Sequence, residues 1–239
     1  MAAFGHPHLH MRSTDSTNER ARELAGTGAP AGTVVTAGEQ SAGRGRHGRV
    51  WSAPAGAALL YSAILRPLDE RHGLLPLAAP IAVCDAIESL APVRCRIKWP
   101  NDVWIEESKL AGILIEARPP DWAVIGVGVN VSIAHDEFPD DLRWPATSVG
   151  HGAKVADVRD ALNEALAARV EEAQDATLAA FRERDALLGR EIGWVGAGSA
   201  ANDGSGVARG IDERGNLVVE TPDGERLALG SGEVSLRLA

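Results

Sequence analysis

Three strand-like segments follow one another closely between residues 94 and 131, and this spacing limits the folds that are open to the chain. They are residues 94–99, 112–117 and 122–131, and they are rich in β-branched and other apolar residues. Strands joined by short turns favour antiparallel pairing, because a parallel pair needs a long crossover connection. We therefore expect an α+β fold built on a mixed, largely antiparallel sheet.

Helices and further strands flank this region. Apolar residues at helical spacing predict a helix over residues 74–90 and a long amphipathic helix, or two, over residues 157–188. Ser16 and Glu19 have the spacing of a capping box, which predicts that a short helix starts at Ser16. Two strand-like segments lie between the first two helices: residues 33–36 and 59–65.

The sequence pattern changes after Gly189, where short strand-like segments alternate with Gly, Asp and Asn turns. These segments are residues 191–195, 206–211, 216–220, 226–229 and 234–238. A unit of about 50 residues with this pattern is typical of a small SH3-like β-barrel. The sequence thus predicts two domains, residues 1–188 and residues 189–239.

Charge and composition exclude several classes of function. The 24 Lys and Arg residues against 33 Asp and Glu residues give a formal charge of −9, which disfavours general binding to nucleic acid. No apolar stretch of about 18 residues and no signal-peptide pattern occur, so we expect no membrane partner. Only Cys84 and Cys95 are present, without a Cys-x-x-Cys pair, so the expected location is the cytoplasm.

Residues 43–49, with the sequence GRGRHGR, form a loop rich in glycine and arginine. Glycine lets backbone N–H groups approach an anion closely, and each guanidinium offers planar paired donors to a phosphate or a carboxylate. Similar composition occurs in disordered RNA tethers, but this loop lies between two predicted strands of a folded region. We interpret it as an anion-binding loop, followed by Trp51, which either stacks on a base or packs in the core.

A second polar segment, residues 98–102 with the sequence KWPND, ends a predicted strand in a rigid proline turn. It places a cation, an amide and a carboxylate together, although Asn and Asp are also ordinary turn residues. Lys109 follows at the start of the next strand and is one of only three lysines in the chain. A lysine there is usually a solvated edge charge, but a compact ammonium also suits a point contact to a phosphate or carboxylate oxygen.

Two weaker signals lie elsewhere. Residues 126–130, with the sequence GVGVN, interrupt a β-branched strand with glycines, which indicates that a ligand or another segment passes close to the backbone. His6, His8 and His10 alternate near the N-terminus, but no fourth ligand lies nearby, so a metal site is not favoured.

Taken together, these motifs resemble the biotin–protein ligase (holocarboxylase synthetase) family. The matching segments keep the family's order and similar spacing over about residues 12–135; they are STN at 16–18, Gln40 with the glycine-arginine loop and Trp51, KWPND at 98–102, KLAGILIE at 109–116 and GVGVN at 126–130. The resemblance implies a class II synthetase-like catalytic domain over residues 1–188 and an SH3-like C-terminal domain over residues 189–239. It also leads us to expect the form of the family without an N-terminal DNA-binding domain.

The resemblance implies a two-step reaction. The carboxylate of biotin attacks the α-phosphate of ATP to give biotinyl-5′-AMP and pyrophosphate, and a lysine of a biotin carboxyl carrier domain then attacks the mixed anhydride. Two anions meet in the first step, so fixed cations are needed; we expect them from Arg46, Arg49 and Lys109, with Mg²⁺ neutralising the triphosphate. The glycine-arginine loop is expected to close over the adenylate and exclude water.

The family pattern also implies a role for each site residue. The expected biotin-binding residues are Ser16, Thr17, Gln40, Arg44, Arg46 and Lys109, with Gly112 and Gly126 leaving space for the bicyclic ring. The expected ATP-binding residues are Arg46, Arg49, Trp51, Asn101, Lys109 and Asn130. The expected catalytic residues are Lys109, Arg46, Arg49 and Asp102, of which Asp102 is also the candidate metal ligand and the candidate base for the incoming lysine.

The sequence leaves other functions open. The nearest alternative is a lipoate– or octanoate–protein ligase on a related fold. A non-catalytic biotin- or nucleotide-binding protein is the second, and an RNA-binding protein that uses the glycine-arginine loop is the third, which the net charge of −9 disfavours.

Overall fold

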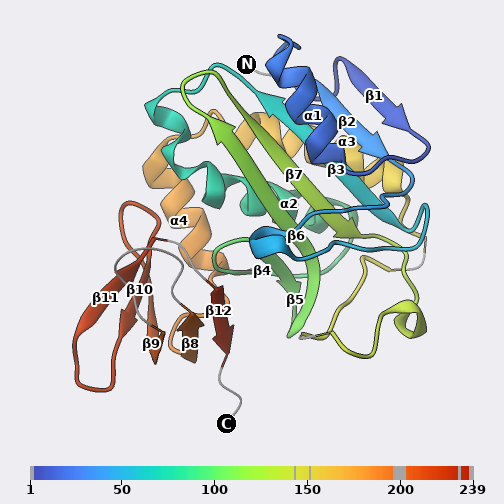
Figure 1. Cartoon of the computed structure of the whole chain (residues 1–239). Coiled ribbons are helices and arrows are strands. Elements are labelled where there is room, and N and C mark those ends of the chain that lie inside the picture. Colours follow the sequence, from blue (N-terminus) through green and yellow to red (C-terminus); the bar gives the residue numbers. More distant parts are fainter. Residues whose placement is uncertain (1–2, 143, 151, 196–202, 231–232, 237–239) are drawn as a thin grey trace.

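A seven-stranded sheet forms the centre of the larger part of the molecule, in a computed structural model that describes residues 3–142, 144–150, 152–195, 203–230 and 233–236. The strand order is β1-β2-β3-β7-β6-β5-β4 (Figure 1). β1 pairs parallel with β2, and the other neighbouring strands pair antiparallel. The expected mixed, largely antiparallel sheet is thereby confirmed.

Two of these strands were not predicted. β1 is an exposed edge strand without an apolar face, and β5 starts at Asp102, which the sequence alone indicates as a turn residue. The strand bounds are β1 (His8–Met11), β2 (Val34–Ala37), β3 (Ala58–Leu65), β4 (Cys95–Lys98), β5 (Asp102–Ile105), β6 (Ser108–Arg118) and β7 (Trp122–Asn130).

Helices cover both faces of this sheet (Figure 1). α1 (Thr17–Gly26) packs on β2, β3 and β7, while α2 (Leu75–Leu90) and α3 (Val155–Arg169) pack on each other and on the opposite face. Strand residues alternate between two apolar cores, because successive side chains point to opposite faces: Val35 belongs to the α1 core and Val34 to the α2 core. α4 (Gln174–Arg184) packs beside α2, so the predicted helical region 157–188 holds two helices.

The segment Glu70–Leu90, which includes α2, is apolar and long enough to cross a bilayer. Within its most apolar 18-residue window, 67% of the residues are buried, and α2 packs against the sheet, α3 and α4. Its apolar character is thus that of a core helix.

The start of α1 differs from the expected capping box. Ser16 occupies the N-cap position, but its side chain makes no capping hydrogen bond. The Thr17 N–H donates instead to Gln40 Oε1 at 2.7 Å, because the bridge between Thr14 and Gln40 brings that amide to the helix start. The Ser16 hydroxyl is therefore not used by the helix, and Glu19 makes other contacts that are described below.

The C-terminal part is a small antiparallel sheet of the SH3-like kind, as expected, with the strand order β11-β10-β9-β8-β12. The strand bounds are β8 (Glu191–Val195), β9 (Gly204–Ile211), β10 (Leu217–Glu220), β11 (Arg226–Leu229) and β12 (Glu233–Leu236). The last two residues of the strand predicted over 234–238 lie outside the described residues. This sheet contacts the larger one near β4: Trp99 Nε1 donates to the carbonyl oxygen of Gly215 at 3.0 Å.

Candidate active site

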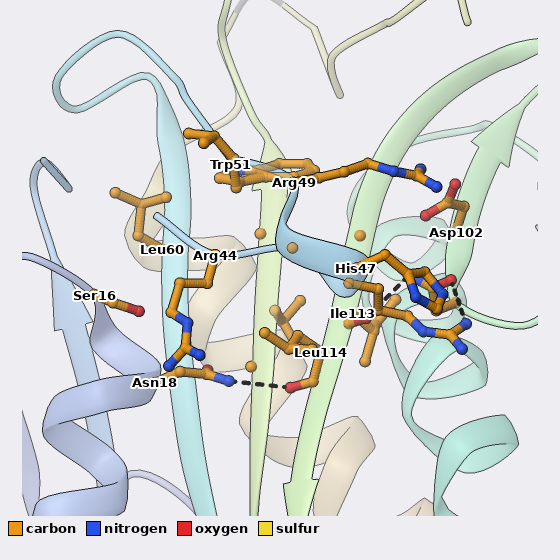
Figure 2. A pocket seen from close by; sticks show the side chains of 18 of the residues that line it. Ser16, Asn18, Arg44, His47, Arg49, Trp51, Leu60, Asp102, Ile113 and Leu114 are labelled. Atoms are coloured by element: carbon orange, nitrogen blue, oxygen red, sulfur yellow. Dashed lines mark hydrogen bonds between the residues drawn. The ribbon is translucent and has the colours of Figure 1, made fainter. Parts of the chain in front are cut away.

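A cleft of about 880 Å³, including the solvent at its mouth, lies on the α1 side of the seven-stranded sheet (Figure 2). Its walls come from the start of α1, from β3, β6 and β7, from the glycine-arginine loop, from the KWPND turn and from β12. Most of the site residues expected from the sequence line this cleft: Ser16, Thr17, Gln40, Arg44, Arg46, Arg49, Trp51, Asn101, Asp102, Lys109, Gly112 and Gly126.

Paired glycines form the floor of the cleft. Gly112 and Gly128 are cross-strand neighbours on β6 and β7. The Trp51 ring lies directly on them: a Cβ on Gly112 would be 3.0 Å from that ring, and a Cβ on Gly128 would collide with it. A Cβ on Gly126 would collide with the Asn18 amide. The glycines thus allow Trp51 and Asn18 to approach the sheet backbone, the close approach that glycine within a strand indicates.

The end of the cleft beside α1 is polar and buried. Thr17 Oγ1 donates to Gln40 Oε1 at 3.0 Å, and Ser62 Oγ lies 2.8 Å from Thr17 Oγ1 and 2.6 Å from Asn18 Oδ1. Asn18 Nδ2 donates to the Leu114 carbonyl oxygen at 3.3 Å. These bonds hold the side chains in fixed orientations, as a site that recognises a ligand by its hydrogen bonds requires.

Sequence reasoning had assigned no role to Asn18 or Ser62. Asn18 stands in the quoted STN segment, and Ser62 is a polar residue inside the otherwise apolar strand β3. A polar side chain in a buried strand needs a partner, and this is the signal that was available in the sequence.

The glycine-arginine loop is a hairpin, not an irregular segment. Trp51 N–H donates to the Gly43 carbonyl oxygen at 3.0 Å, and Gly45 N–H donates to the Arg49 carbonyl oxygen at 2.7 Å. A short 3₁₀ turn, η1 (Arg46–Gly48), forms the tip, where His47 has a φ of 55°. We call residues 43–51 the Arg-Gly hairpin; it crosses the cleft above β6 and β7 (Figure 2).

The hairpin tip carries arginine toward the KWPND turn. Arg46 Nη1 donates to Asn101 Oδ1 at 3.2 Å. Burial lowers the pKa of the Arg46 guanidinium; the charge of Asp102 opposes this shift and that of Arg49 adds to it. Arginine remains charged in proteins even so, and a partly desolvated cation interacts more strongly with an anion than one in bulk water.

Lys109 and Asp102 form an ion pair inside the cleft. The distance from Lys109 Nζ to Asp102 Oδ1 is 2.7 Å, and the Asp102 side chain is only 9% exposed. Lys109 Nζ also lies 5.7 Å from the centroid of the Trp51 ring. The lysine that sequence reasoning singled out is therefore held between a carboxylate and an aromatic ring at the cleft wall.

The C-terminal sheet reaches the same cleft, which the sequence had not indicated. Lys98 is buried, and its Nζ donates to the carbonyl oxygen of Val234 on β12 at 2.7 Å. The same ammonium lies 5.8 and 5.5 Å from the ring centroids of Trp104 and Trp144. Charge-assisted bonding and ring contacts stabilise a buried cation, so Lys98 joins the two sheets at the wall of the cleft.

Asn130 is the one expected site residue that does not line the cleft. Its side chain is buried, and Nδ2 donates to the carbonyl oxygens of Thr147 at 3.0 Å and Lys109 at 3.4 Å. In this geometry Asn130 supports the backbone that carries Lys109, and the expected contact with a nucleotide stays a prediction.

The cleft offers few ligands for a metal ion. Asp102 is the one acidic residue among those that line it, and no group of three His, Cys, Asp or Glu side chains suited to a metal occurs in the described part of the chain. Mg²⁺ commonly binds through one or two carboxylates together with substrate phosphates and water. The residues fit a Mg²⁺ ion only if a phosphate-bearing substrate carries it, and Asp102 is the carboxylate in the cleft that would hold such an ion.

Comparison with known proteins shows the family of this chain. The Biotin/lipoate A/B protein ligase family matches residues 10–130, and the Biotin protein ligase C terminal domain matches residues 201–237. The chain belongs to the biotin/lipoate A/B protein ligase family. The resemblance to the biotin–protein ligase family, which the sequence motifs indicate, is thereby confirmed.

Individual relatives agree with this ligase-family assignment. The biotin--[acetyl-CoA-carboxylase] ligase of Mycobacterium tuberculosis is 37% identical over 92% of this chain and 85% of its own length, and the bifunctional ligase/repressor BirA of Bacillus subtilis is 35% identical over 87% and 68%. The structure of the Aquifex aeolicus biotin protein ligase in complex with biotin and ATP aligns with a TM-score of 0.82, 28% identity and coverage of 97% of this chain and 99% of that one.

Proposed function

We propose that this chain is an ATP-dependent biotin–protein ligase, which activates biotin as biotinyl-5′-AMP and transfers it to a lysine of a biotin carboxyl carrier domain. The observation that carries the proposal is the charge of the cleft. Besides Arg44, four cationic residues line it against one carboxylate in a chain of net charge −9: Arg46, Arg49, Lys98 and Lys109. Such a concentration of positive charge suits a reaction between two anions.

Biotin would bind with its ureido ring at the polar end of the cleft. Ser16, Thr17 and Gln40 offer hydroxyl and amide groups there, and the buried bonds of Ser62 and Asn18 hold these groups in place. The backbone around Arg44 would complete the contact. The match to the Biotin protein ligase C terminal domain and the biotin named in the relatives favour biotin over lipoate or octanoate.

The first step would take place where the hairpin tip faces the KWPND turn. The carboxylate of biotin attacks the α-phosphate, the bond to the bridging oxygen breaks, and pyrophosphate leaves. Lys109, Arg46 and Arg49 would stabilise the charge that develops on the phosphoryl oxygens, while Trp51 and Asn101 would contact the nucleotide. Mg²⁺ bound to the triphosphate supplies further neutralisation.

The second step would use the same residues with a different nucleophile. The amine of the carrier lysine attacks the carbonyl carbon of the mixed anhydride and releases AMP, and the Asp102 carboxylate would accept the amine proton. Closure of the hairpin would keep water from hydrolysing the adenylate before the carrier arrives.

We propose a catalytic unit over residues 1–188 and a C-terminal unit over residues 189–239. The bond from Lys98 to Val234 favours joint action of the two units at the cleft. Cys84 and Cys95 are both free and buried, which supports the cytoplasmic location that we propose.

The test is direct detection of the intermediate. The protein is mixed with ATP, Mg²⁺ and labelled biotin, and labelled biotinyl-5′-AMP is separated and measured; a carrier domain added afterwards takes up the label. Competition between biotin and lipoate in ATP–pyrophosphate exchange separates the two ligases. Tight biotin binding without any adenylate would refute the enzyme and favour a non-catalytic binding protein.

A further inference from the structure

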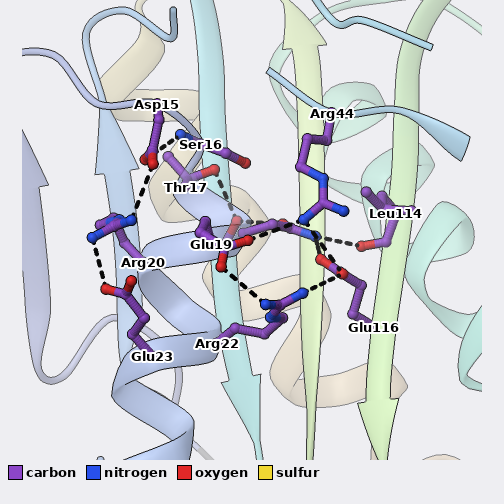
Figure 3. A network of polar contacts seen from close by, with 12 residues as sticks. Asp15, Ser16, Thr17, Glu19, Arg20, Arg22, Glu23, Arg44, Leu114 and Glu116 are labelled. Atoms are coloured by element: carbon purple, nitrogen blue, oxygen red, sulfur yellow. Dashed lines mark hydrogen bonds and ion pairs between the residues drawn. The ribbon is translucent and has the colours of Figure 1, made fainter. Parts of the chain in front are cut away.

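One arginine of the Arg-Gly hairpin does not join the cations of the cleft. Arg46 reaches across to Asn101, whereas the Arg44 guanidinium points toward α1 and β6 (Figure 3). Arg44 Nη1 lies 3.0 Å from Glu19 Oε2 and 3.8 Å from Glu116 Oε1. Its charge is thus directed at carboxylates of the fold, and little of it is free for a phosphate.

These two carboxylates are themselves held in place. Arg22 of α1 contacts both, with 2.9 Å from Nη2 to Glu19 Oε1 and 3.2 Å from Nη1 to Glu116 Oε1. The four side chains alternate in charge around a ring: Arg44, Glu19, Arg22 and Glu116 (Figure 3). Asn18 Nδ2 donates to Glu116 Oε2 at 3.0 Å, which connects this ring to the polar end of the cleft.

A contact that holds the Arg44 side chain also restrains the rest of the Arg-Gly hairpin. Arg44 forms an antiparallel bridge with Val50, between the hydrogen bonds that join Gly45 to Arg49 and Trp51 to Gly43. The two paired segments of the hairpin move together, because sliding one past the other would break all the hydrogen bonds between them. Fastening Arg44 therefore also fastens Trp51 and the tip that carries Arg46.

We propose that Arg44 is a positioning residue, whose side chain fastens the Arg-Gly hairpin to α1 and β6 through Glu19 and Glu116 and so holds the hairpin closed over the cleft. Its effect on catalysis rests on the proposed ligase function, but its effect on the hairpin does not. Arg44 is about half exposed, so the effect is that of one partly exposed ion pair, about fivefold in an equilibrium or a rate.

Hydrogen exchange on the ligand-free protein tests the fastening itself. Arg44→Met and Glu19→Gln should each speed exchange of the Gly45 and Trp51 amides about fivefold. The double variant should be no faster than Arg44→Met alone, because Arg44→Met already removes the contact that Glu19→Gln breaks. Arg44→Lys should restore part of the protection. Arg209→Met is the matched control: it breaks an ion pair of similar exposure with Glu220, at 2.8 Å on the C-terminal sheet, and should leave these amides unchanged.

Kinetics tests the consequence for the reaction. Both single variants should raise the rate at which labelled adenylate escapes in a chase about fivefold, with little change in the KM for ATP. A phosphate-binding Arg44 would give the opposite pattern: Arg44→Met would raise the KM for ATP, and Glu19→Gln would have no effect. Unchanged amide exchange in both single variants would also overturn the proposal. If the unaltered protein makes no adenylate, the ligase function fails, while the exchange experiment still decides the role of Arg44.

Discussion

Substitution of Lys109 by alanine removes the cation that is nearest to Asp102 in the cleft. The two charged groups lie 2.7 Å apart, and the lysine side chain is 26% exposed. Lys109→Ala therefore has two consequences that can be measured separately. It removes a fixed charge from the place where phosphoryl charge would develop, and it leaves the Asp102 carboxylate without its partner.

The two consequences differ in size. Loss of one preorganised group that faces developing charge costs about 3 kcal/mol, which corresponds to a rate of adenylate formation about 150-fold lower. A fully buried ion pair broken on one side costs about 3–5 kcal/mol, and partial exposure of Lys109 reduces this to about 1–2 kcal/mol. For a chain of this size the Tm should fall by about 2–8 °C, so the variant should remain folded at 25 °C.

Biotin-dependent ATP–pyrophosphate exchange measures the first effect, and thermal unfolding measures the second. Lys154→Ala is the matched control, because Lys154 is one of the other two lysines and is exposed at the N-cap of α3, outside the cleft. Lys109→Arg keeps the charge but not the shape beside Trp51 and Gly112, so an intermediate loss of about tenfold is expected.

A double variant separates a role of the two charges in catalysis from their mutual neutralisation. If Lys109 and Asp102 serve only to balance each other's charge, then Lys109→Ala combined with Asp102→Ala should recover both Tm and exchange activity. We expect recovery of Tm alone. Exchange activity of folded Lys109→Ala within threefold of the unaltered protein, a change of about 0.7 kcal/mol, would refute the electrostatic role.

Three further substitutions address other parts of the structure. Arg46→Gly removes the contact of the hairpin tip with Asn101, so adenylate should form but escape early in a chase with unlabelled biotin; unchanged retention would contradict the closure of the hairpin. Gly126→Ala places a Cβ against the Asn18 amide and should raise the KM for biotin about fivefold or more, from an overpacking penalty of ~1–3 kcal/mol, whereas Gly26→Ala, with no neighbour at that position, should not. Burial raises the pKa of Asp185, so its ionisation at neutral pH destabilises the fold; Asp185→Asn should raise the Tm at pH 7, and the gain should disappear as the pH falls through this raised pKa toward the ordinary value near 3.8. An equal gain at pH 3 and pH 7 would show that the carboxylate charge is not the cause.

Much of the fold follows from local patterns in the sequence. The apolar spacing of α2, the apolar run of β3 and the β-branched residues of β7 predict these elements, because buried faces of helices and strands carry apolar residues. β1 and β5 were missed for the same reason: an exposed edge strand and a strand that starts at a turn-forming aspartate lack that pattern.

Part of the site was also accessible from the sequence. Lys109 stands out because lysine is rare in this chain, and the spacing between the KWPND segment and Lys109 brings Asp102 and Lys109 onto neighbouring strands. Ser62 and Val234 were missed, because each reaches the cleft only through contacts with a distant segment. The Ser16 capping box was wrong: the Ser16 side chain makes no capping bond, and the helix start is bonded through the Thr17 N–H to Gln40, a residue that lies 23 positions further along the chain.

The amino-acid sequence alone determined the helices and strands with strong periodicity, the change to short strands after Gly189, and the chemical types that meet at the cleft. Only the tertiary structure decided which groups pair. The three arginines of the hairpin look equivalent in sequence, yet Arg44 binds the carboxylates of α1 and β6 while Arg46 faces Asn101. Lys98 finds its acceptor 136 residues further along the chain. Such partners depend on how distant segments pack, and local propensity carries no information about that packing.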